Sequence, residues 1–143
     1  DSAFLSFICV VTAAEALSGY RYGGGNLRSR FVKFVKAYFP DEYLEHAEEL
    51  YTLRKGLVHA FSTGNFDLTH HQSHVHLRTT TRGRTVLNAE DLYSALLVAS
   101  RKYFVELEAS LALQTQLMAR LDGEGGGSIG VYSIAILPSK RAR

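Results

Sequence analysis

Arg54 and His59 are the two residues whose type and spacing could support chemistry in an otherwise apolar segment. We expect a helix from Asp41 to a point before Gly64. At about 100° per residue, its apolar arc contains Leu44, Ala47, Leu50, Tyr51, Leu57, Val58 and Phe61. Arg54 falls near the middle of this arc. A guanidinium group keeps its charge at ordinary pH, and burying it without a partner is very costly. Arg54 is therefore expected to face an acidic partner, a cleft or an interface.

Glu15 is the acidic residue that we expect to pair with Arg54. In the helix predicted over residues 2–18, it continues an apolar line formed by Phe4, Ile8 and Val11. An acid and an arginine on the apolar faces of one small domain favour a charge-assisted contact. Two alternatives remain open. Glu15 could be a solvated residue near a helix end, and Arg54 could be a purely structural arginine that pairs with another acid.

His59 follows Arg54 by five positions, with Gly56 between them. Side chains at this spacing in a regular helix diverge by about 140°, so the two would not point the same way. They would converge only if the helix were distorted at Gly56, or if a second subunit shared the site. Periodicity alone predicts that His59 is a surface residue.

The segment Tyr51-Thr-Leu-Arg54-Lys55-Gly-Leu-Val-His59-Ala-Phe61 resembles the signature helix of the HEPN family. HEPN domains are four- or five-helix bundles with an Arg-x4–6-His motif late in an internal helix, and the order of the helices expected over residues 2–121 is similar. The resemblance implies a metal-independent endoribonuclease with no cofactor, often within a toxin–antitoxin or antiviral defence system. It also implies a homodimer in which two motif helices face each other across one cleft.

The implied reaction is cleavage of RNA by its own 2′-OH group. A histidine that titrates near pH ~6.5 can accept or donate the protons, and an arginine can hold the phosphate. We therefore assign Arg54, Lys55, His59 and Glu15 to the candidate catalytic site. Lys55 departs from the family pattern, because active members usually carry Asn, Asp or His there, but a lysine can bind phosphate. The alternative is a non-catalytic interaction or nucleotide-binding module in which Arg54 is structural.

A second basic surface is expected on the helix predicted over residues 26–39. Its candidate RNA-binding residues are Arg30, Lys33 and Lys36. The opposite face is apolar and contains Leu27, Phe31, Phe34, Val35 and Tyr38. Further arginines that could steer RNA phosphates follow at positions Arg78, Arg82 and Arg84. A solvated charged face is the alternative interpretation.

Four histidines lie close together in the sequence, at positions His70, His71, His74 and His76. Alternation would place His74 and His76 on the same side of a strand, where they could bind zinc. Asp67 is the only acidic residue nearby, and no cysteine accompanies the cluster. Surface polarity is therefore the favoured interpretation, and we predict no metal site.

The pattern as a whole predicts a mainly all-α fold, a bundle of four to five helices. A last long helix is expected from a cap at Asn88 to about residue 121, preceded by a small β-hairpin of residues 74–78 and 84–87 with a turn at Arg82-Gly83. We expect the bundle to cover residues 1–121 and a flexible Gly-rich linker to cover residues 122–128. Residues 129–143 would form a strand-like segment and a basic tail.

Composition limits the remaining possibilities. The 143 residues fit one domain, and the formal net charge of +2 is too small to argue for nucleic acid by itself. Cys9 is the single cysteine, which excludes an internal disulfide and suits a reducing, cytoplasmic compartment. The apolar run Ala3–Leu17 is shorter than the roughly 20 residues of a membrane span and contains Glu15, so we predict a buried helix and no membrane contact. The expected partners are RNA, a second copy of the chain, and a protein such as an antitoxin.

Overall fold

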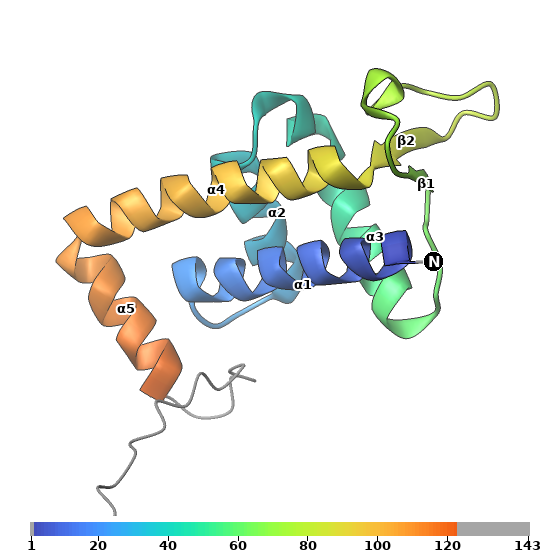
Figure 1. Ribbon diagram of the computed structural model, residues 1–143. Helices are drawn as coiled ribbons and strands as arrows, with labels where there is room; N and C mark the ends of the chain where they lie inside the picture. Colours follow the sequence, from blue (N-terminus) through green and yellow to red (C-terminus); the bar gives the residue numbers. More distant parts are fainter. Residues whose placement is uncertain (1, 123–143) are drawn as a thin grey trace, which may run out of the picture.

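Helix α1, Ser2–Tyr22, is the element around which the other helices pack. The computed structural model describes residues 2–122 (Figure 1). The predicted Gly-rich linker after residue 122, the strand-like segment and the basic tail lie outside the described residues. Within them, the fold is a helical bundle with a minor β element, as the sequence predicted.

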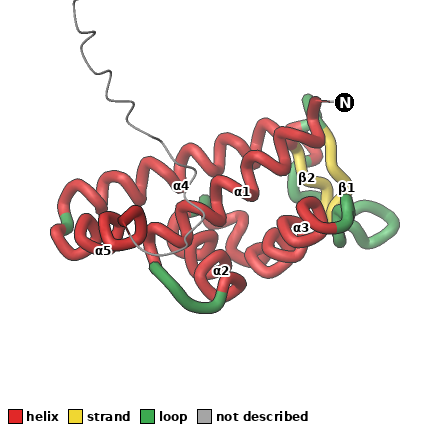
Figure 2. The backbone as a smooth tube through the Cα atoms, turned by 90° about the horizontal axis from the view of Figure 1, so that it is seen from below, coloured by secondary structure: helices red, strands yellow, loops and turns green. Residues whose placement is uncertain are grey.

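Four α-helices surround α1: α2, Leu27–Tyr38; α3, Ala47–His59; α4, Ala89–Ala109; and α5, Leu111–Asp122. Figure 2 shows α1 between α4 on one side and α2 and α3 on the other. Helices α1 and α4 run in the same direction, so their N-terminal ends lie together beside the strands (Figure 1). The core between these helices is rich in large side chains, including Phe7, Phe31, Phe34, Tyr43, Leu50, Leu53, Leu57, Leu92 and Tyr103.

Helix α2 follows the predicted pattern closely. Asn26 caps it, because its Oδ1 accepts a hydrogen bond from Ser29 N at 3.0 Å. Its buried residues are Phe31, Val32, Phe34, Val35 and Tyr38. Amphipathic spacing and a capping residue together are sufficient here to predict the helix and the face that it buries.

The motif helix begins later than predicted. Residues Asp41–His46 form a separate 3-10 helix, η1, and α3 starts at Ala47. The predicted arc is correct for the buried residues Ala47, Leu50 and Leu57. The predicted apolar arc also included Leu44, Val58 and Phe61, and this was wrong because all three are exposed. It did not include Leu53, which is fully buried.

The single long helix predicted from residue 89 to residue 121 is wrong, because the chain breaks at Ser110. This residue has extended backbone angles, with φ −127° and ψ 109°. Its Oγ accepts a hydrogen bond from Leu113 N at 3.2 Å and so caps α5. The break lets α5 fold back and pack against α1 instead of extending past the bundle.

Strand β2, Thr85–Asn88, confirms the strand predicted over residues 84–87 within one residue. Its partner differs from the prediction: β2 pairs in parallel with β1, Phe66–Thr69, with Phe66 opposite Thr85. Parallel strands need a crossover connection rather than a tight turn. The 15 residues between Thr69 and Thr85 make this connection.

The strand predicted over residues 74–78 is wrong. The short 3-10 helix η2, Ser73–Val75, occupies its first half, and Leu77 has a left-handed backbone with φ of 59°. In place of the predicted hairpin, the structure has a single isolated antiparallel bridge between Thr79 and Thr85. The predicted turn is present, since Gly83 N donates to the carbonyl of Thr80 at 2.9 Å.

Helix α1 is longer than the predicted 2–18. Its segment Ala3–Tyr22 has the length and the mean hydropathy, 1.6, of a helix that could cross a membrane. In this fold it packs against all four of the other α-helices and buries Phe7, Val10, Val11 and Ala14. In this fold 33% of that segment's most apolar window is buried.

Candidate functional site

Arg54 on α3 and Glu15 on α1 form an ion pair through Arg54 Nε and Glu15 Oε2. The predicted contact is therefore confirmed. The two side chains are 15% and 18% exposed, so the pair is mostly shielded from water but is not sealed. Partial burial strengthens the attraction between the charges and raises the cost of removing either one. The pair ties the motif helix to the central helix.

Two more arginines approach this ion pair. Burial lowers the pKa of Arg30 on α2, the nearby Arg120 and Arg54 lower it further, and Glu15 raises it. Such mutual effects require charges that lie close together in space. Arg30, Arg54, Arg120 and Glu15, here called the arginine cluster, therefore bring together residues of four helices. Three positive charges face one negative charge, so the cluster keeps an excess of positive charge.

Two glycines, Gly19 in the last turns of α1 and Gly23 just after it, lie against the arginine cluster. A Cβ atom on Gly19 would lie 3.3 Å from Nη2 of Arg120, which is tighter than an ordinary contact. Arg30 Nη1 donates to the carbonyl oxygen of Gly23 at 3.3 Å. Gly23 has a φ of 74°, a conformation that favours glycine. Among residues 2–122, the buried Nε of Arg30 finds no hydrogen-bond partner, so this guanidinium keeps an unused donor.

His59 lies apart from the arginine cluster within one chain. Helix α3 runs as a continuous α-helix through Gly56 to His59, so Arg54 and His59 diverge by about 140°. The side chains of His59 and Lys55 are exposed. Within residues 2–122, the side chain of His59 makes no hydrogen bond, ion pair or ring contact. The distortion at Gly56 that could have brought the two motif residues together is absent from α3.

Gly56 has a different structural role. Its carbonyl accepts hydrogen bonds from Ala60 N at 2.9 Å and from Ser62 N at 3.0 Å. A Cβ atom on Gly56 would clash with the carbonyl oxygen of Ser62. The glycine therefore lets the chain fold back across the end of α3 and stop the helix next to His59.

An exposed apolar surface adjoins His59. Val58 is 43% exposed and Phe61 is 77% exposed. Phe61 stacks on Phe4 of α1, with ring centroids 5.9 Å apart, and Leu5 beside Phe4 is 63% exposed. Large apolar side chains gathered at one end of α3 are typical of a surface that contacts another protein. We call Val58 and Phe61 the apolar rim.

The predicted RNA-binding residues divide into two groups. Lys33 and Lys36 are exposed on α2, as expected for a charged face. The side chain of Arg30 is instead part of the arginine cluster. Of the arginines predicted near the strands, Arg78 and Arg82 are exposed. Arg84 binds within the fold through the Asp67 carboxylate at 2.6 Å and the Thr63 and Gly64 oxygens, so its role is structural.

The four histidines do not act as the alternation of residues 74–76 suggested. His76 is fixed within the fold: its Nδ1 accepts from Asn88 N at 3.0 Å, and its Nε2 lies 2.7 Å from the hydroxyl of Tyr43. His74 is exposed in η2 and does not share a strand face with His76. The hypothesis that His74 and His76 could bind a zinc ion from the same face of a strand is therefore wrong.

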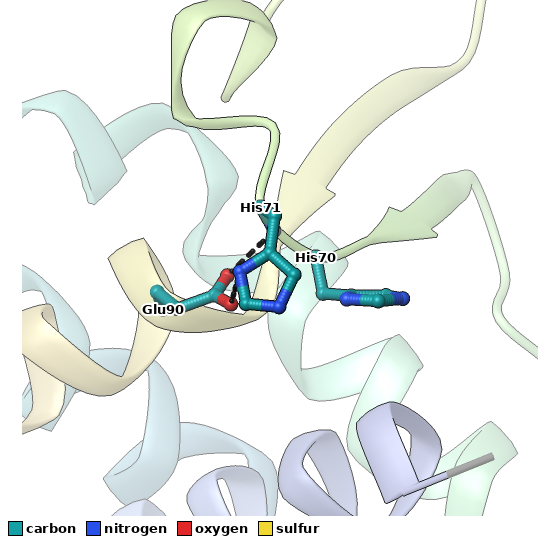
Figure 3. Close-up of side chains that lie close together, drawn as sticks. All are labelled: His70, His71 and Glu90. Carbon is teal, nitrogen blue, oxygen red and sulfur yellow. Dashed lines mark hydrogen bonds and ion pairs between the residues drawn. The ribbon is translucent and has the colours of Figure 1, made fainter.

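His70 and His71 lie together with Glu90, an acid that the sequence analysis did not consider (Figure 3). His71 Nδ1 is 2.9 Å from Glu90 Oε1, and His71 N donates to Glu90 Oε2 at 3.1 Å. These backbone and side-chain contacts of His71 lower the pKa of the Glu90 carboxyl. The pairing was hard to foresee, because it links the loop after β1 to the first turn of α4.

No protein-family model, curated protein sequence or solved structure matches this chain. The resemblance to HEPN domains therefore depends on the Arg54–His59 motif and the order of the helices alone.

Proposed function

We propose that the chain is a HEPN-type endoribonuclease that works as a homodimer and needs no metal ion. The observation that carries the proposal is the arginine cluster, in which Arg54 belongs to a group with three positive charges and one negative charge. An excess of guanidinium groups that are only partly shielded is suited to binding a phosphate of RNA.

The proposed reaction uses the RNA itself as the nucleophile. The 2′-OH loses its proton to one His59 imidazole, and its oxygen forms a bond to the adjacent phosphorus. The bond from phosphorus to the 5′-oxygen breaks, and the proton that His59 took up is returned to that oxygen. Arg54 stabilises the negative charge that builds on the phosphoryl oxygens. The products are a 2′,3′-cyclic phosphate and a free 5′-OH.

A second copy of the chain completes the site in this proposal. Arg54 and His59 diverge on one regular helix, so one chain alone does not present both to a single phosphate. A two-fold axis beside α3 would supply two copies of each residue to one cleft. The apolar rim beside His59 supports this location, because dimerisation would cover Val58 and Phe61.

Incubation of a labelled single-stranded RNA with the tag-free protein in excess EDTA tests the proposal. We expect cleavage that leaves a 2′,3′-cyclic phosphate. His59→Ala should abolish cleavage without changing the circular dichroism spectrum, since the His59 side chain is exposed and has no hydrogen bond or ion pair within residues 2–122 to lose. His74→Ala, another exposed histidine, is the matched control and should cleave like the wild type. Cleavage that persists unchanged in His59→Ala would contradict the assignment.

The second candidate function is a non-catalytic module that binds RNA or a nucleotide. The ion pair with Glu15 favours it, because an arginine that already has a carboxylate partner can serve the fold alone. The two functions differ in one experiment. The module would bind RNA through the arginine cluster, and its RNA would stay intact in both the wild type and His59→Ala.

A further inference from the structure

A pocket separate from the arginine cluster opens where the N-terminal ends of α1 and α4 meet the loop after β1. It has a volume of about 590 Å³, and its lining includes Cys9, His70, His71, Glu90 and Tyr93. The proposed ribonuclease chemistry uses none of these residues. Two imidazoles and a carboxylate in the lining of one pocket are a set of donors that borderline metal ions prefer.

The three donors are close enough to share one ion. One ligand atom from each of His70, His71 and Glu90 lies within 4.8 Å of the others. Donors about 2.1 Å from a tetrahedral zinc ion lie roughly 3.4 Å apart, so donor atoms that are up to 4.8 Å apart must draw together to share the ion. All three side chains are exposed and can make this adjustment by small rotations.

The backbone already holds two of these residues in place. His71 has a left-handed φ of 57°, which is uncommon for a residue with a side chain. Its N–H bonds to Glu90, and the next residue, Gln72, donates from its backbone N to Asn88 Oδ1 at 3.0 Å. These two hydrogen bonds hold the loop against the start of α4. The imidazole of His70 lies edge-on to that of His71, with centroids 4.8 Å apart, and has no hydrogen bond within the described residues (Figure 3).

We propose that His70, His71 and Glu90 bind a divalent transition-metal ion such as Zn²⁺ at the edge of this pocket. Three protein ligands leave a fourth zinc position for water or for a ligand in the pocket. The site is independent of the proposed RNA cleavage, which is expected to survive EDTA.

Calorimetric titration of tag-free, EDTA-treated protein with Zn²⁺ tests the site. We expect one ion per chain. Substitution of a ligand by His70→Ala, His71→Ala or Glu90→Gln should weaken binding by at least about tenfold, since even outer-shell changes cost 10- to 100-fold. His74→Ala, in the same segment but outside the group, should bind like the wild type. Binding should weaken as the pH falls through the range where imidazoles take up protons.

Two further measurements keep the test decisive if a variant is poorly folded. In the wild type, Zn²⁺ should shift the imidazole NMR signals of His70 and His71 and leave those of His59 and His74 in place. Cys9→Ser should retain the site, because the three assigned ligands suffice. The assignment is overturned if the wild type takes up no Zn²⁺, if the shifts appear at other histidines, or if Cys9→Ser abolishes binding while His70→Ala does not.

Discussion

Glu15 and Arg54 link the central helix α1 to the motif helix α3 through one partly buried ion pair. Glu15 is also the one acid in the arginine cluster, so it offsets the repulsion between Arg54 and the two neighbouring guanidinium groups. The same carboxylate therefore has two effects. It stabilises the packing of α3 on α1, and it limits how strongly the cluster can attract an external anion.

Glu15→Ala should destabilise the fold by about 3 kcal/mol, the lower end of the range for a buried pair left with one charge. The reason is that three guanidinium groups would remain together without a carboxylate. Urea unfolding of the variant and the wild type measures the difference. Glu108→Ala, which removes an exposed acid from α4, should change stability by less than about 0.5 kcal/mol. A similarly small change for Glu15→Ala would place this carboxylate outside the cluster.

The same variant should respond more strongly to phosphate. An anion that binds the folded state alone stabilises it by mass action, and the cluster without Glu15 should bind it more tightly. We expect added inorganic phosphate to raise the Tm of Glu15→Ala more than that of the wild type. A sodium chloride control at equal ionic strength removes the general effect of screening. Equal shifts in both proteins would argue against an anion site at the cluster.

Gly56→Ala should destabilise the fold by roughly 1–3 kcal/mol, because the added methyl group would clash with the carbonyl oxygen of Ser62. Gly24→Ala is the matched control. No atom lies within 4 Å of a Cβ atom at Gly24, so this change should cost almost nothing. Thermal unfolding of the two variants makes the comparison. If both were equally stable, the chain after α3 would not fold back across Gly56.

His76 should make the fold less stable in mild acid. Burial lowers its pKa below the ordinary value of 6.5. Between these two pKa values the unfolded chain binds the proton more readily than the folded chain, so stability falls as the pH drops below about 6.5. One such proton contributes at most about 1.4 kcal/mol per pH unit.

His76→Asn isolates this effect, because the amide oxygen can accept from Asn88 N in place of Nδ1 but the side chain does not titrate. Urea unfolding at pH 7.5 and pH 5.5 should show a smaller loss of stability in the variant than in the wild type. The exposed His74 provides the control, and His74→Asn should keep the wild-type slope. An identical slope in His76→Asn would show that His76 does not set the acid response.

The sequence predicted the bundle because apolar periodicity dictates which face each helix must bury. It predicted the Glu15–Arg54 contact for a related reason, since a charge on an apolar face needs a partner. It could not predict the break at Ser110. The apolar stripe continues past this residue without a proline or glycine, and the packing of α5 on α1 decides the outcome.

The β element and the group of His70, His71 and Glu90 depend on contacts between residues far apart in the sequence, which the periodicity of apolar residues does not predict. Strand β1 has only four residues and pairs with a strand 19 positions later, Phe66 with Thr85. His71 likewise meets Glu90 only because both flank this parallel pair. The left-handed backbone of Leu77, which ends the predicted strand, occurs at a residue type that rarely adopts it.

A subunit-mixing experiment tests most directly the claim that two chains share one RNA-cleaving site. His59→Ala and Arg54→Gln are first shown to be inactive alone and are then mixed, denatured and refolded together. A mixed dimer contains Arg54 from one chain facing His59 from the other. We predict that cleavage of single-stranded RNA in EDTA returns to about a quarter of the wild-type rate, because half of the dimers are mixed and each restores one of two symmetric pairs. A refolded mixture as inactive as its two components, beside active wild type treated in the same way, would contradict the account.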